Sequence, residues 1–178
     1  PLLQASHSGP IADHGGQQSS LLHNYGTKTY ANGSKYVGSF LNSKRHGYGT
    51  VHYPRGLGTY SGQWVNNKKC GVGSMHYANG DVYKGEWAND VPHGMGTLRL
   101  APAARVGCID GEVYTGQFVN KMKEGKGKFV WSNGDMYEGE WKGDVRHGEG
   151  VMTFGNGRSV VRQLYREGKL VSEWQVGL

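Results

Sequence analysis

The sequence predicts an all-β fold, an elongated single-layer antiparallel meander of stacked β-hairpin repeats with about six units. Three observations support this fold class. A residue pattern recurs about every 23 residues. Apolar and polar residues alternate within each copy, as they do in strands. Asn-Gly pairs, which favour tight hairpin turns, separate the copies. Most residues that look special in this chain are therefore special because they are repeated.

The first strand of each repeat carries a tyrosine, a glycine and a second aromatic residue at alternate positions. Full repeats begin at Tyr36, Tyr60, Tyr83, Tyr114 and Tyr137. The third copy reads YKGEWANDVPHGMG, in which Tyr83, Gly85 and Trp87 share one face of the strand. A ring can lie across a neighbouring strand only where no side chain stands. This explains the glycines, although glycine in a strand costs about 0.5–1 kcal/mol.

The second strand begins at the last glycine of Gly-x-Gly and alternates in the same way. Residues 73–77 read GSMHY and 127–131 read GKFVW, so apolar side chains again share a face. Asn-Gly follows this strand in several units, at 32–33, 79–80, 133–134 and 156–157. We expect the tight turns there because both residues tolerate positive φ, and we expect a longer connection near 42–45. About twelve strands spaced roughly 4.8 Å apart give a ribbon on the order of 55 Å long.

The repeats divide the chain into two parts. Residues 1–22 are polar and show no periodicity, so we interpret them as an N-terminal arm or linker. Residues 23–178 form the repeat domain, which opens with a half repeat at 23–35. A degenerate unit starts at Val160, where we align Arg162 with the first glycine and Leu164 with the second aromatic residue; such a unit is expected to cap the array. The third repeat carries an insertion within 101–112, and insertions in repeats form loops at one edge.

The pattern Y-x-G-x-W-x-x-x-x-x-H-G-x-G resembles the MORN (membrane occupation and recognition nexus) repeat, from residue 23 to about residue 170. The resemblance implies a grooved sheet with a non-catalytic role in scaffolding, protein binding or membrane association. It also favours an intracellular cytoskeletal or ciliary setting. The first residue, Pro1, and the basic pI near 9.3 keep an organellar (mitochondrial) complex subunit as an alternative. Phe40 and Phe118 depart from the pattern at the tryptophan, and Cys70 and Glu124 depart from it at the histidine.

Single residues give no sign of catalysis. His46, His93 and His147 occupy one position of the repeat, and neighbouring repeats lie roughly 10 Å apart, beyond the reach of a shared metal. Gly-x-Gly is not followed by a helix pattern, so a nucleotide site is not predicted. We expect no enzyme activity, no metal and no cofactor.

The aromatic face is the strongest functional feature. A single-layer sheet cannot cover its own face, so we expect an apolar groove that binds an extended or helical segment of a protein partner. Its candidate residues are Tyr36, Phe40, Tyr60, Trp64, Tyr83, Trp87, Tyr114, Phe118, Tyr137 and Trp141. The chain is then a scaffold or structural subunit of a larger assembly.

Basic residues suggest an alternative. The net charge is +6, and seven cations fall at the turns along one edge: Lys44, Arg45, Lys68, Lys69, Lys121, Lys123 and Arg146. Such an edge could attract anionic phospholipids, at about 1 kcal/mol per residue, as in a peripheral membrane adaptor. A solvated edge that keeps the sheet soluble is the plainer interpretation. Nucleic acid is not favoured because the cations do not interleave with the aromatic residues. No run reaches the roughly 18 apolar residues of a membrane span.

Overall fold

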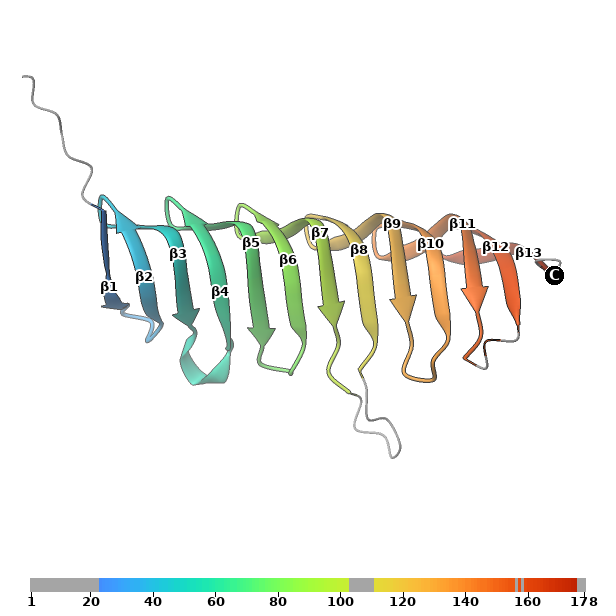
Figure 1. Cartoon of the computed structure of the whole chain (residues 1–178), viewed down its shortest axis with the longest axis horizontal. Helices are drawn as coiled ribbons and strands as arrows, with labels where there is room; N and C mark the ends of the chain where they lie inside the picture. Colours follow the sequence, from blue (N-terminus) through green and yellow to red (C-terminus); the bar gives the residue numbers. More distant parts are fainter. Residues whose placement is uncertain (1–22, 103–110, 156, 158, 176–178) are drawn as a thin grey trace, which may run out of the picture.

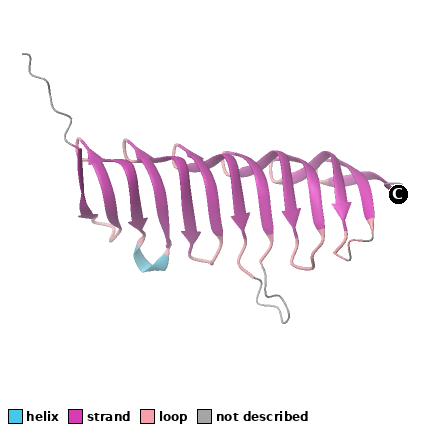
Figure 2. Ribbon diagram, in the orientation of Figure 1, coloured by secondary structure: helices cyan, strands magenta, loops and turns pink. Residues whose placement is uncertain are grey.

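The computed structural model describes residues 23–102, 111–155, 157 and 159–175. Thirteen strands form one antiparallel sheet in sequence order, so the elongated single-layer meander is confirmed (Figure 1; Figure 2). The strands are β1 (His23–Thr29), β2 (Lys35–Leu41), β3 (Lys44–His52), β4 (Gly58–Val65), β5 (Lys68–Tyr77), β6 (Val82–Ala88), β7 (Val91–Arg99), β8 (Val113–Val119), β9 (Met122–Val130), β10 (Met136–Lys142), β11 (Val145–Thr153), β12 (Val160–Arg166) and β13 (Lys169–Gln175). One 3-10 turn, η1 (Pro54–Gly56), lies between β3 and β4.

The tight turns lie at the connection for which a longer loop was expected. Only Asn42 and Ser43 separate β2 from β3, and their φ angles are 48° and 61°. Positive φ at both central residues defines the type I′ turn, whose twist matches that of the flanking strands. Asn66 and Asn67 repeat this geometry with φ angles of 49° and 70°. The prediction of a longer connection here was therefore wrong.

The Asn-Gly connections are the longer ones. Between β1 and β2, Tyr30 exchanges backbone hydrogen bonds with Ser34 and Gly33, and only Gly33 of the Asn-Gly pair has positive φ, at 84°. The side chain of Asn32 accepts the Ser34 N–H at 3.0 Å, which stabilises the wider loop. The same bond joins Asn79 to Asp81 and Asn133 to Asp135. The prediction of tight turns with positive φ at both residues of Asn-Gly was wrong, because the asparagine side chain accepts a backbone hydrogen bond that stabilises the wider loop.

Each first strand bends sharply at its glycine. The pairing of β2 with β3 shifts register between Gly38 and Phe40, and the other hairpins shift at the equivalent place. The ring centroids of Tyr36 and Phe40 are 5.0 Å apart, whereas residues four apart on a straight strand are separated by roughly 13 Å. The rings therefore lie inside the bend. We call their side of the sheet the concave face and the opposite side the outer face.

A continuous ladder of aromatic rings on the concave face forms the core. Each tyrosine meets the second aromatic residue of the next unit edge-on, for example Tyr60 with Trp87 at 5.0 Å and Tyr83 with Phe118 at 5.1 Å. The tyrosine rings lie over paired glycines of neighbouring strands, and a Cβ on Gly73 would overlap the ring of Tyr60. The proposed role is thus confirmed for the glycine of the first strand and for the last glycine of Gly-x-Gly. For the first glycine of Gly-x-Gly it was wrong: Gly71 has a positive φ of 53°, and a Cβ there would meet Gln63 and no ring.

The last unit continues the ladder one residue later than aligned. Val161 pairs with Met152, and Gln163 pairs with Gly150, so Val161, Gln163 and Tyr165 hold the tyrosine, glycine and aromatic positions. Tyr165 meets Tyr137 at 5.7 Å. The alignment of Arg162 and Leu164 with this face was wrong. The shift arises because the loop between β11 and β12 is one residue longer than the equivalent loop between β9 and β10. The hydrogen bond that closes the first loop joins Phe154 to Ser159, and the one that closes the second joins Trp131 to Asp135.

Candidate interaction surfaces

The ten rings predicted to line a groove are all buried. None is more than 7% exposed, because the bend folds each strand around its own rings and the glycines receive them. The tyrosine hydroxyls donate to backbone carbonyls, as Tyr36 does to Ser39 at 2.9 Å. Burial raises the pKa of Tyr36 to about 12, although Arg45 acts in the opposite direction. These rings form the floor of the concave face, and partner binding there stays a prediction.

The seven cations of the predicted edge separate into two groups. Four lie half-buried on the concave face over a ring of the next unit: Arg45 over Trp64 at 4.1 Å, Lys69 over Trp87 at 4.8 Å, Lys123 over Trp141 at 5.0 Å, and Arg146 over Tyr165 at 4.3 Å. Burial lowers the pKa of Lys69 and Lys123. The other three, Lys44, Lys68 and Lys121, are exposed at the turns. Only these three form an open basic edge.

At three junctions the turn of one unit is joined to the preceding unit by a two-bond clamp. The N–H of Asp90 donates to the carbonyl of Lys69 at 3.1 Å, and its Oδ1 accepts the N–H of Lys69 at 2.9 Å. Asp144 binds Lys123 in the same way, and Asn67 binds Arg45. An Asn or Asp at the second position of the turn therefore binds the backbone of the cationic residue in the preceding unit.

The junction between the third and fourth repeats lacks these features. Pro92 stands at the cation position, is buried, and has no N–H to donate. The second turn residue is Lys121, whose N–H alone bonds to the Pro92 carbonyl, at 2.9 Å. The second aromatic residue of the fourth repeat is Phe118, which has no side-chain N–H. It therefore cannot form the hydrogen bond that the indole N–H of Trp87 donates to the carbonyl of Gly73. The sequence showed that Phe118 departs from the repeat pattern at the tryptophan position. It did not reveal that Phe118, Pro92 and Lys121 lie at the same junction.

A second row of rings flanks the floor of the concave face. Tyr30, Tyr53, Trp131 and Phe154 are partly buried and pack against the ladder. They come from the ends of the second strands and the adjoining loops, where alternation places them on the same face. Unlike the ten floor rings, they keep accessible surface. The alternation of apolar and polar residues in the sequence indicated that these rings share a face with the ladder, but they were not among the predicted site residues.

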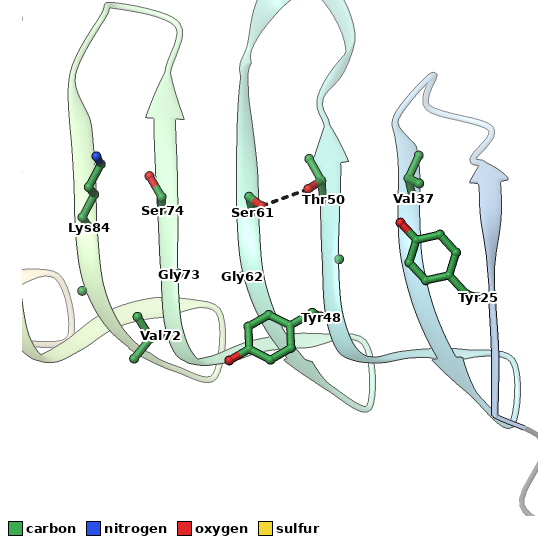
Figure 3. A pocket seen from close by; sticks show the side chains of 12 residues that line it. Tyr25, Val37, Tyr48, Thr50, Ser61, Gly62, Val72, Gly73, Ser74 and Lys84 are labelled. Carbon is green, nitrogen blue, oxygen red and sulfur yellow. Dashed lines mark hydrogen bonds between the residues drawn. The ribbon is translucent and has the colours of Figure 1, made fainter.

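The outer face carries apolar side chains that sequence reasoning missed. Tyr25, Tyr48, Val72 and Met95 are 73%, 65%, 61% and 51% exposed. They occupy the middle of Asn-x-Gly or Gly-x-Gly in successive units, a position that becomes Lys126 and Glu149 later in the chain. Figure 3 shows Tyr25, Tyr48 and Val72 beside a shallow cavity of about 490 Å³, where Thr50 and Ser61 share a 2.9 Å hydrogen bond. The signal for this patch was the apolar middle residue.

The described residues hold no group of three His, Cys, Asp or Glu side chains that could bind a metal. Glu124, at the histidine position, accepts the N–H of Gly143 at 2.9 Å. Cys70 is half-buried, and burial raises the pKa of its thiol. No helix in the described part of the chain is long and apolar enough to cross a membrane.

Comparison with known families agrees with the geometry. A family model described as MORN repeat matches six segments, residues 20–35, 36–58, 60–82, 83–102, 114–136 and 137–157. No curated protein matches the chain. The six matched segments cover most of the sequence and coincide with the hairpin units, so the chain belongs to the MORN repeat family.

Proposed function

We propose that the chain is a non-catalytic scaffold or structural subunit that binds a segment of a partner protein along its concave face. MORN repeats are generally non-catalytic and often mediate protein or membrane contacts. The observation that carries the proposal is the repeated chemistry of this face. A cation over a ring recurs in four of the five full repeats, and partly buried second-row rings recur along the same face, with neighbouring units roughly 10 Å apart.

The ten floor rings serve this function by shaping the concave face. Contact with a partner comes chiefly from the cations and from second-row rings such as Tyr30, Tyr53 and Trp131. Arginine and aromatic side chains are enriched where interfaces gain most of their energy. The proposed setting is a cytoskeletal or ciliary assembly within the cell, with an organellar complex as the alternative.

Affinity purification with matched variants tests the binding face. Tyr30→Ser with Tyr53→Ser removes second-row rings, whereas Tyr48→Ser with Val72→Ser removes outer-face side chains. We expect the first pair to lose the co-purifying partner and the second pair to retain it. Retention by the first pair and loss by the second would move the site to the outer face. Trp64→Ala is unsuitable because Trp64 is 1% exposed and its loss damages the core.

A second candidate function is a peripheral membrane adaptor that binds anionic phospholipids. The turn edge combines exposed Lys44, Lys68 and Lys121 with exposed Val65 and Met122. Cations beside apolar side chains are typical of surfaces that enter the headgroup region. Vesicles of anionic phospholipid should then bind the protein at low salt, and binding should collapse when the three lysines become Glu. Binding unaffected by these charge reversals excludes this candidate.

A further inference from the structure

The half repeat and the first three full repeats line a cavity on the concave face. It measures about 230 Å³ and is lined by Tyr30, Ser34, Arg45, Tyr53, Lys69 and Asp90 among others. The side chains come from the loop after β1, from β3, from β5 and from the turn after β6. The cavity therefore joins groups from four consecutive units of the chain.

Ser34 brings a buried hydroxyl to this cavity. It is 4% exposed, and its Oγ has no hydrogen-bond partner among the described residues. The equivalent residues Asp81 and Asp135 accept the N–H groups of Ala101 and Gly155, twenty residues further along the chain. The residue twenty positions after Ser34 is Pro54, which has no N–H. At this loop a carboxylate is absent and a donor hydroxyl stands in its place.

Arg45 brings a second free donor. Its guanidinium lies 4.1 Å from the centre of the Trp64 ring, and Nη2 donates to the carbonyl of Asn67 at 2.8 Å. The Nε atom is buried and has no hydrogen-bond partner within the described residues. Packing on Trp64 and the hydrogen bond to Asn67 thus hold the guanidinium group of Arg45 in place, and its Nε–H stays available to a ligand.

The charges in the cavity select a monoanion. Arg45 and Lys69 contribute two positive charges, and Asp90 contributes one negative charge, which leaves a net charge of +1. Oδ1 of Asp90 already accepts the N–H of Lys69. A doubly charged phosphate would exceed this net charge, whereas one carboxylate balances it. Arginine also presents its donors in a geometry that suits a carboxylate.

We infer that this cavity binds a carboxylate of the partner segment, supplied by an acidic side chain. Arg45 Nε and the Lys69 ammonium donate to the carboxylate, and the Ser34 hydroxyl supplies a neutral donor. Tyr30 and Tyr53 flank the site with rings. The inference rests on the proposed function, which it deepens by naming the chemistry of the partner.

The test uses the isolated, isotope-labelled protein and a small probe, so it does not depend on finding the partner. N-acetyl-glutamate methylamide is titrated against the matched glutamine compound, sodium phosphate and sodium chloride at equal ionic strength. We expect saturable NMR shifts of Arg45 Nε–H and Trp64 Nε1–H with the glutamate probe only. Equal shifts with the glutamine compound, or stronger binding of phosphate, overturn the assignment.

Variants place the response at the cavity. Arg45→Gln should weaken binding of the glutamate probe about tenfold or more, and Ser34→Ala several-fold, because each removes a donor. Arg146→Gln is the control, since Arg146 holds the same position in the fifth repeat, where Asp135 replaces Ser34. Should Arg45→Gln not fold, Arg45→Lys keeps the charge over Trp64 but removes Nε. Unchanged affinity in the folded variants refutes the site, whereas probe binding without any partner capture refutes only the scaffold function.

Discussion

The junction between the second and third repeats and the junction between the third and fourth share one ladder but differ at the turn edge. At the first, Trp87 donates to Gly73, Lys69 lies over the Trp87 ring, and Asp90 clamps Lys69. At the second, the three positions hold Phe118, Pro92 and Lys121. The comparison teaches that strand pairing and the edge-on ring contact join two units without the indole, the cation or the clamp. We therefore expect these three features to act together and to add stability where they are present.

The largest expected effect tests what the two junctions have in common. Tyr60 and Tyr83, one at each junction, are buried, and burial raises the pKa of both. Because the folded pKa exceeds the unfolded value near 10, the native state keeps protons that the unfolded state loses, so stability falls as the pH rises above about 10. Burial raises the pKa of Tyr36 to about 12, and the contributions of the ladder tyrosines add up, which makes this the largest expected effect.

Tyrosine absorbance and tryptophan fluorescence followed against pH check this effect. We expect the buried ladder tyrosines to ionise late and together with loss of the fold, at both junctions at once. Ionisation of every tyrosine near pH 10 in a protein that stays folded would show that the ladder is open to solvent.

Truncation of a ring separates the two junctions. Trp87→Ala and Phe118→Ala should each cost about 3–5 kcal/mol of unfolding free energy, as for other large core truncations. Trp87→Ala should cost more because it also removes the bond to Gly73 and the contact with Lys69. Denaturant unfolding measures both values. A greater loss for Phe118→Ala would mean that the added layer contributes nothing at Trp87.

Loss of the clamp should give a smaller effect. Asp90→Ala removes the bond to the Lys69 N–H and should cost about 1 kcal/mol. Lys121→Ala is the matched control, with an expected change within about 0.5 kcal/mol because only its backbone bonds to Pro92. The midpoint of urea unfolding distinguishes them, and equal midpoints would remove the clamp from the account.

The smallest expected effect is the conversion of one junction into the other. Pro92→Lys combined with Lys121→Asp should add about 0.5–1 kcal/mol by supplying a cation over Phe118 and an acceptor for the new N–H. Each single change should add less than the pair, because the new N–H and the new carboxylate need each other. Strict additivity of the two changes would argue against a restored clamp.

Much of the fold could be predicted from residue spacing, because alternation and repeated glycines are local properties of the chain. The bend could not, because it arises from a register shift between paired strands, such as that at Gly38 and Phe40. Without the bend, the rings at Tyr36 and Phe40 look like an exposed strip, whereas they are buried.

The candidate sites show the same limit. Lys68 and Lys69 are adjacent in sequence, yet one is exposed and the other lies over Trp87, because neighbours on a strand face opposite ways. The free hydroxyl of Ser34 depends on Pro54 in the next unit, and no local pattern reveals that relation.

Native-state hydrogen exchange tests the central claim most directly. It compares the amides that pair β5 with β6, at the second and third repeats, with those that pair β7 with β8, at the third and fourth. We predict that the β7–β8 amides open at a lower free energy, and that Pro92→Lys with Lys121→Asp reduces the difference. Equal protection at both junctions, or stronger protection between β7 and β8, would contradict the account.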